Sequence, residues 1–274
     1  KIKDVEGIGP AAARKLADAD ILSVQDLATQ SIEMLSESTG VSKDLAEKQI
    51  KNAYKLLREN NIVPEEFITG NQDLKKRANI KKIQTGSAKL DEFLKGGVET
   101  SAITELFGAF GSGKSQLCHQ LAVNSQRDLG GNVIFIDTES TFRPERIMDM
   151  CDNEVDRYTT ILENIKKCKV NNSGHLEYII RNLATFVEQY NAKLVVIDSI
   201  IALHRADYSG RGTLADRQQK INTILHRLLR ISQMYSIAVV MTNQITTSPD
   251  TFFGDPNKPT GGNIIGHAST YRLY

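Results

Sequence analysis

The feature that most constrains the fold is a glycine-rich octapeptide in the first half of the chain. It reads Gly108, Ala109, Phe110, Gly111, Ser112, Gly113, Lys114 and Ser115, and matches the pattern G-x-x-x-x-G-K-[ST]. An apolar run over 102–107 precedes it, and a helical pattern over 113–127 follows. Glycines let the backbone curl so that its amides point at phosphate oxygens, and the N-terminus of a helix favours negative charge. The sequence therefore predicts a strand, a phosphate-binding loop and a helix.

The last two residues of this loop suit a nucleotide bound with a metal ion. Lys114 is expected to reach the β- and γ-phosphates of ATP, and the Ser115 hydroxyl is expected to ligate Mg²⁺. The alternative is a tight turn that binds nothing, but a chance match between a strand and a helix is improbable. We therefore predict an ATPase that uses ATP and Mg²⁺.

Apolar runs alternate with helical patterns through the rest of the chain. Short β-rich runs cover 132–136, 193–197 and 237–242, and helical patterns cover 177–190 and 215–235. This alternation predicts an α/β domain with a mainly parallel sheet covered on both faces, over 80–274. In such folds ligands bind at the carboxyl ends of the strands.

Three carboxylates follow two of these predicted strands. Asp198 ends the run 193–197 and is the second candidate Mg²⁺ residue, partly through water, although an Asp there could also cap the next helix. Asp137 and Glu139 follow the run 132–136, where a carboxylate could orient or deprotonate the attacking water. Glu139 is the better catalytic candidate; local spacing does not separate it from Asp137, and hydrogen bonding within the turn is possible for either.

The strand over 237–242 is followed by Asn243 and Gln244, where an amide that senses the γ-phosphate would lie. A Gln244 side chain can donate to phosphate and accept from other groups, so it could report hydrolysis to the polar segment 245–269. Another polar segment, 205–217, carries arginines beside glycines. Because it comes earlier in the chain, it is called the first polar segment below, and 245–269 is called the second. Two such segments next to a phosphate site resemble a channel for single-stranded DNA, although charged segments are more often solvated surface.

The first 60 residues predict a small all-α domain. Helical patterns over 11–19, 24–28 and 44–57 are separated by turns, and Gly7, Gly9 and Pro10 precede the first of them as in a helix-hairpin-helix motif. Such glycines would let backbone amides contact DNA phosphates without reading sequence. The alternative is an interaction module whose glycines serve only tight turns. Residues 61–79 combine polar residues with a basic cluster and suit a linker.

Composition limits the remaining possibilities. The net charge of +1 gives no global attraction to nucleic acid, so any DNA contact must be local. Three unpaired cysteines give no sign of a disulfide framework or a zinc site, and no apolar run approaches the roughly 18–20 residues that span a bilayer. We expect a soluble protein of the cytoplasm, associated with the nucleoid, with no membrane partner.

Taken together, these motifs resemble the RecA/RadA family of DNA recombinases, and within it the archaeal members. The resemblance extends from about residue 5 to residue 274, and its most specific parts are the phosphate loop, the segments 136–146 and 208–219, and the residues Thr242, Asn243, Gln244, Gly261, Gly262 and Asn263. It implies a RecA-like ATPase core with a helix-hairpin-helix domain. It also implies helical filaments on single-stranded DNA that pair with homologous duplex DNA and exchange strands, with ATP between neighbouring subunits.

The resemblance also implies roles for individual residues. Glu139 matches a catalytic glutamate, Lys114 and Gln244 complete the catalytic set, and Gln116 and Arg146 join the nucleotide site, with Arg146 against the adenine. The implied DNA contacts are Arg211, Gly212 and Arg217 in a first loop and Gly261, Gly262 and Asn263 in a second. Phe67 and Gly70 match a polymerisation motif in the linker, which has Gly70 where alanine is commoner.

Two departures from the family pattern stand out. The connection over 127–131 is shorter than usual, and the sequence stops in an apparent strand at Tyr274, where the family continues with a segment that caps a neighbour's ATP. Two other functions remain compatible with the motifs. One is a ring helicase or translocase with a RecA-like fold, and the other is a mediator related to recombinases that does not exchange strands.

Overall fold

The computed structural model describes residues 1–65, 67–208, 214–247 and 257–274. Its internal contacts divide these residues into two compact units. The helical unit comprises Lys1–Ile80 together with Tyr178–Gln189, and the sheet unit comprises Lys81–Glu177 together with Tyr190–Tyr274. Each unit has its own buried core, and the two are described separately below.

Short helices build the helical unit around small and aliphatic residues. They are η1 (Ile2–Asp4), α1 (Pro10–Asp18), α2 (Val24–Thr29), α3 (Ile32–Thr39), α4 (Lys43–Glu59) and α5 (Gly70–Arg77), with α11 (Leu183–Tyr190) from later in the chain. Ser23, Ser31 and Ser42 cap α2, α3 and α4, each accepting a hydrogen bond from a backbone N–H three residues further on. Leu16, Leu27, Leu35 and other apolar residues fill the core. The all-α N-terminal domain that the sequence predicts is confirmed.

The sheet unit contains a parallel sheet in the order β5-β4-β6-β7-β3-β9, and β8 pairs antiparallel with β7. The bounds are β3 (Ala102–Gly108), β4 (Asn132–Asp137), β5 (Ile165–Lys169), β6 (Ala192–Asp198), β7 (Ala238–Thr247), β8 (Asn257–Pro259) and β9 (Tyr271–Leu273). A separate antiparallel pair joins β1 (Lys82–Ile83) to β2 (Val98–Glu99). The predicted α/β fold with a mainly parallel sheet is confirmed.

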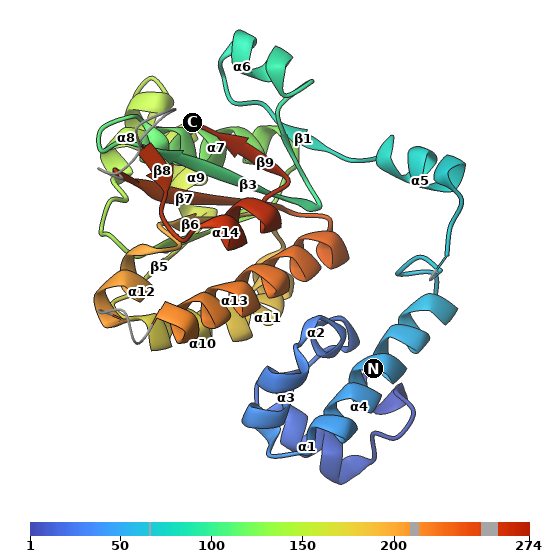
Figure 1. The fold of residues 1–274 in the computed structure, drawn as a ribbon. Helices are drawn as coiled ribbons and strands as arrows, with labels where there is room; N and C mark the ends of the chain where they lie inside the picture. Colours follow the sequence, from blue (N-terminus) through green and yellow to red (C-terminus); the bar gives the residue numbers. More distant parts are fainter. Residues whose placement is uncertain (66, 209–213, 248–256) are drawn as a thin grey trace. The chain divides into compact units, whose positions relative to one another are not determined.

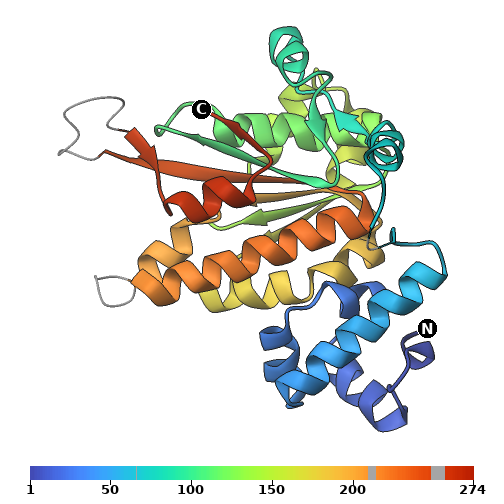
Figure 2. The same ribbon diagram turned by 45° about the vertical axis from the view of Figure 1, so that its right-hand side comes forward.

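Helices cover both faces of this sheet (Figure 1, Figure 2). One face carries α7 (Lys114–Asp128), with α8 (Pro144–Met150) and α9 (Val155–Glu163) beside it, and the other carries α13 (Leu214–Tyr235) and α14 (Asn263–Ala268). The shorter helices are α6 (Ala88–Phe93), α10 (Ser173–Arg181) and α12 (Ala202–Asp207). No described helix is long and apolar enough to cross a membrane.

Two registers decide where the functional side chains meet. Gly108 at the end of β3 is paired with Gln244 of β7, and Asp137 at the end of β4 is paired with Asp198 of β6. Because β3, β7, β6 and β4 are successive neighbours, their carboxyl ends form one continuous edge of the sheet. The loops that follow these strands therefore begin side by side.

The sequence located the central strands better than the peripheral elements. The predicted strands over 102–107, 132–136 and 193–197 match β3, β4 and β6 to within a residue or two, whereas β7 runs to residue 247, well past the predicted end at 242. The predicted helix over 177–190 begins earlier, at residue 173, and is divided at Asn182 into α10 and α11. The predicted linker contains helix α5, which begins at Gly70 and is closed at its start by reciprocal hydrogen bonds between Thr69 and Gln72.

Candidate functional site

The glycine-rich octapeptide forms the turn between β3 and α7 (Figure 1). Gly108, Gly111 and Gly113 have φ of 158°, 77° and 91°, a region that side-chain-bearing residues rarely adopt. A Cβ on Gly108 would also lie 2.9 Å from the Ser112 Oγ. The backbone of the loop therefore favours glycine at these three positions.

Lys114 supplies the positive charge of this loop. It is the first residue of α7, and its Nζ donates to the carbonyl oxygens of Gly108 at 2.9 Å and Ala109 at 2.8 Å. Ser115 follows in the first turn of the helix, half-buried, and the Phe110 side chain is fully exposed. A flexible ammonium group, a helix N-terminus and a hydroxyl within one turn fit the phosphates and Mg²⁺ of a nucleotide.

Asp198 lies buried at the end of β6, with both carboxylate oxygens held by hydroxyl groups. Thr242 of β7 donates to Oδ1, and Thr141 from the loop after β4 donates to Oδ2 at 2.8 Å. These bonds fix the carboxylate without neutralising it. An oriented carboxylate at this edge suits a Mg²⁺ ion held through its water shell. Sequence analysis did not connect the two threonines with Asp198, because both are distant from it in the chain.

The structure places Asp137 and Glu139 in different surroundings. Asp137 is fully buried: Oδ1 accepts from the backbone N–H of Thr141 at 3.0 Å, and Oδ2 lies 3.3 Å from the Lys167 Nζ. Glu139 is exposed, and its Oε1 accepts from the Ser199 Oγ at 2.7 Å and from the Gln244 Nε2 at 2.9 Å. Asp137 thus shapes the loop, whereas the Glu139 carboxylate remains accessible to a water molecule.

Gln244 of β7 contacts this carboxylate directly. Besides donating to Glu139, its Oε1 accepts a long hydrogen bond of 3.4 Å from the Arg205 Nη1 of α12. Gln244 is therefore held between the loop after β4 and the helix that leads into the first polar segment. This arrangement suits an amide that changes partners when a phosphate is present.

His119 of α7 is a further buried link that sequence reasoning missed. Its Nδ1 lies 2.6 Å from the carbonyl oxygen of Ser115, and its Nε2 accepts from the backbone N–H of Arg143 at 3.1 Å. Burial lowers its pKa, which favours the neutral ring that both bonds require. The side chain thus ties the phosphate loop's helix to the loop that carries Glu139. A histidine inside an amphipathic helix gives no sequence signal for such a role.

Arg146 and Gln116 lie together beside the phosphate loop. The Arg146 Nε donates to the Gln116 Oε1 at 2.9 Å, and the Arg146 Nη1 donates to Asp149 at 2.8 Å. Both Arg146 and Gln116 are exposed. The guanidinium plane is therefore available to a flat ring such as adenine.

The predicted DNA-contacting residues are only partly described. Arg211 and Gly212 lie outside the described residues, and Arg217 lies in the first turns of α13. Gly261 and Gly262, with φ of 93° and 66°, connect β8 to α14, which begins at Asn263. Phe67 is 94% exposed in the linker, and Gly70 begins α5.

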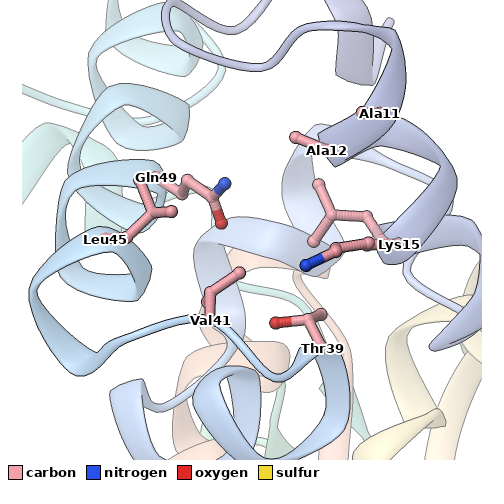
Figure 3. A pocket seen from close by; sticks show the side chains of 8 residues that line it. Ala11, Ala12, Lys15, Thr39, Val41, Leu45 and Gln49 are labelled. Atoms are coloured by element: carbon pink, nitrogen blue, oxygen red, sulfur yellow. The ribbon is translucent and has the colours of Figure 1, made fainter.

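The helical unit contains a small cavity between α1, α4 and the turn after α3 (Figure 3). It measures about 190 Å³ and is lined by aliphatic residues such as Val41 and Leu45, with Lys15 and Gln49 as polar members. Gly7 and Gly40, in the turns before α1 and α4, have φ of 83° and 67°. The turn at Gly7 is the tight turn that the helix-hairpin-helix pattern predicts.

Comparisons with known proteins match both units. A model of the Rad51 family matches residues 76–274, and a model described as a SAM-like helix-hairpin-helix tandem matches residues 1–53. A protein of Cenarchaeum symbiosum described as DNA repair and recombination protein RadA is 43% identical over 279 residues, covering 100% of this chain and 70% of its own length. A protein of Methanoculleus marisnigri with the same description is 42% identical, covering 100% of this chain and 87% of its own length.

Proposed function

The chain belongs to the Rad51 family, and from this premise we propose that it is an ATP-dependent recombinase that forms filaments on single-stranded DNA and exchanges strands with homologous duplex DNA. The observation that carries the proposal is the hydrogen bond between the Gln244 Nε2 and the Glu139 Oε1. It joins the candidate hydrolytic carboxylate to the strand that continues into the second DNA-binding segment. A phosphate loop alone, which many unrelated nucleotide-binding proteins share, would not require this contact.

The nucleotide site supports a division of labour among its residues. Lys114 and the amides of the phosphate loop bind the phosphates, while Ser115 and Asp198 hold Mg²⁺, whose bound charge offsets that of the phosphates. Glu139 orients the attacking water, and Arg146 packs against the adenine. Gln244 senses whether the γ-phosphate is present.

ATP binding and hydrolysis would then control the affinity for DNA. With ATP bound, Gln244 turns part of its hydrogen bonding from Glu139 towards the phosphate, and the segments around 205–217 and 245–269 favour their DNA-binding arrangement. Hydrolysis removes that partner. Arg211, Gly212, Arg217, Gly261, Gly262 and Asn263 are the proposed DNA contacts, and Phe67 with Gly70 is the proposed contact between subunits.

A strand-exchange assay tests this proposal. The full chain is incubated with single-stranded DNA, homologous duplex and either ATP or a non-hydrolysable ATP analogue, beside the variants Lys114→Ala and Lys89→Ala. Lys89 is an exposed lysine of α6 and serves as the matched control. We expect exchange by the wild type and by Lys89→Ala, and none by Lys114→Ala.

Other outcomes would identify a different function. Unwinding of duplex without exchange, together with rings in electron micrographs, would indicate a helicase or translocase. DNA binding that persists while exchange stays at background would indicate a mediator. Undiminished exchange by Lys114→Ala would refute the proposed role of the nucleotide site.

A further inference from the structure

The residue before Gln244 is buried on the opposite face of the sheet. Successive side chains of a strand point to opposite faces. Gln244 therefore shares its face with Thr242, which bonds Asp198 on the nucleotide side, whereas Asn243 faces the side covered by α13 and α14. Asn243 is 0% exposed. Its amide nitrogen finds partners within the protein, whereas its Oδ1 has no hydrogen-bond partner among the described residues.

Asn243 uses its amide group to join two segments. Its Nδ2 donates to the Glu105 Oε1 at 2.8 Å and to the carbonyl oxygen of Thr260 at 2.8 Å. Because both partners are acceptors, they fix the orientation of the amide. Glu105 lies on β3, the strand that leads into the phosphate loop, and Thr260 directly follows β8 within the second polar segment. One side chain thus connects both ends of the proposed ATP-to-DNA pathway.

A buried charge network holds this amide in place. Glu105 is fully buried, and its second oxygen accepts from the Arg272 Nε of β9 at 2.6 Å. The Arg272 guanidinium lies 4.9 Å from the centre of the Phe107 ring. A Cβ on Gly266 of α14 would come within 2.9 Å of the same guanidinium. The network therefore touches both Thr260 and α14, two parts of the second polar segment.

The backbone at Gln244 adds a direct link to the same place. The N–H of Thr260 donates to the carbonyl oxygen of Gln244 at 2.8 Å, and the hydroxyls of Thr246 and Thr260 are 2.8 Å apart. A shift of β7 at Gln244 would consequently move Thr260 through three separate contacts. Of these three contacts, the one from Asn243 comes from a side chain that also hydrogen-bonds a side chain of β3, which is itself paired with β7 here.

We propose that Asn243, held by Glu105 and Arg272, is a positioning residue that transmits the nucleotide state sensed at Gln244 to Thr260 and α14, and so sets the DNA affinity of the second segment. The inference rests on the proposed function. Asn243 contacts neither nucleotide nor DNA in this scheme. Its role is to make β3, β7 and the returning strand move together.

The test compares single-stranded DNA binding with and without a non-hydrolysable ATP analogue. Binding of a fluorescent oligonucleotide by the full chain is followed by anisotropy, and the ratio of the two dissociation constants measures the coupling. We expect Asn243→Ala to reduce this ratio about tenfold, the factor that corresponds to the loss of roughly one hydrogen bond. The affinity for the analogue itself, measured separately, is expected to stay within about twofold of the wild type.

Val239→Ala is the matched control, because Val239 is fully buried on the same face of β7 and is distant from Thr260 in the register. It should lower stability while leaving the coupling ratio unchanged. An equal loss of coupling in both variants would reduce Asn243 to a structural role and overturn the inference. If Asn243→Ala does not fold, Asn243→Ser retains one donor and should give an intermediate ratio.

Hydrogen exchange supplies a readout that does not depend on DNA. In the wild type, the analogue should slow amide exchange over 257–268, and in Asn243→Ala this response should be lost. A wild type that responds over 257–268 but shows no nucleotide-dependent DNA binding would contradict the proposed function while supporting the coupling through Asn243. Absence of any response over 257–268 in the wild type, or an undiminished response in Asn243→Ala, would overturn the inference.

Discussion

The different surroundings of Glu139 and Asp137 predict opposite consequences for two equivalent substitutions. Glu139→Gln keeps the length of the side chain and an oxygen that can accept from Ser199 and Gln244. Because Glu139 is exposed, we expect the free energy of unfolding to change by less than about 0.5 kcal/mol. The amide cannot accept a proton from water. DNA-stimulated ATP hydrolysis should therefore fall by about 10²- to 10⁴-fold.

Asp137→Asn should do the reverse. The new NH₂ group meets another donor in either orientation of the amide. On one side it faces the Lys167 ammonium and the Phe142 N–H, and on the other side it faces the Thr141 N–H. Losing a charge-assisted acceptor in a buried site costs about 1.5–3 kcal/mol, and breaking a buried ion pair costs about 3–5 kcal/mol. Lys167 is 37% exposed, so we discount the pair and expect a total loss of about 2–3 kcal/mol.

Urea denaturation and steady-state ATP hydrolysis measure the two quantities on the same preparations. Hydrolysis by folded Asp137→Asn should remain within about tenfold of the wild type, since the Asp137 carboxylate is fully buried and held by Thr141 and Lys167. The reasoning fails if Glu139→Gln hydrolyses ATP at the wild-type rate. It also fails if Asp137→Asn abolishes hydrolysis at unchanged stability, because Asp137 would then be the catalytic group.

Three further predictions concern other parts of the sheet unit. Gly97→Ala would place a Cβ 2.2 Å from the carbonyl oxygen of Ile83 at a φ of 124°, so urea denaturation should show a free energy of unfolding lower by more than about 2 kcal/mol. Gly130→Ala, which has a φ of 64° but open space around its Cβ, should lower it by about 1–2 kcal/mol. Burial lowers the pKa of His204, so as pH falls the unfolded chain binds the proton before the folded chain does, and the free energy of unfolding decreases below pH about 6.5. His204→Phe should reduce the slope of the free energy of unfolding against pH by up to about 1.4 kcal/mol per pH unit. An unchanged slope in urea denaturation at several pH values would contradict this. Arg146→Ala should weaken ATP binding about tenfold in a calorimetric titration, while equal affinity would remove Arg146 from the adenine site.

The central strands were predictable because burial on both faces leaves a strong trace in the sequence. β4 and β6 are nearly continuous apolar runs, and β7 begins with one over 238–241, as expected of strands inside a covered parallel sheet. β3 is apolar apart from Thr104 and Glu105. β5 escaped prediction because it lies at the edge of the described sheet and three of its five residues, Lys166, Lys167 and Lys169, are lysines. A strand at the edge of a sheet often carries lysine, and the same composition also suits a loop.

The candidate site was predictable in its residue types and not in its internal bonds. A glycine-rich loop and a carboxylate after an apolar run are local patterns. The bonds from Thr141 and Thr242 to Asp198 join residues 57 and 44 positions apart, and no spacing rule encodes them. The contact between Gln244 and Glu139 spans 105 positions. These partners follow from strand order, which the sequence left open.

Strand order also explains why one edge can combine chemistry with signalling. β7 lies between β6 and β3, so its end has Asp198 on one side and the start of the phosphate loop on the other. A displacement of that end would shift both the proposed metal ligand and the phosphate loop. Because consecutive residues point to opposite faces, the displacement also reaches the side covered by α13 and α14 without a hinge or a moving domain. A substitution that stiffens or weakens this strand end should therefore alter nucleotide and DNA binding together, whereas one at the end of β5, which β4 and β6 separate from β7, should alter neither.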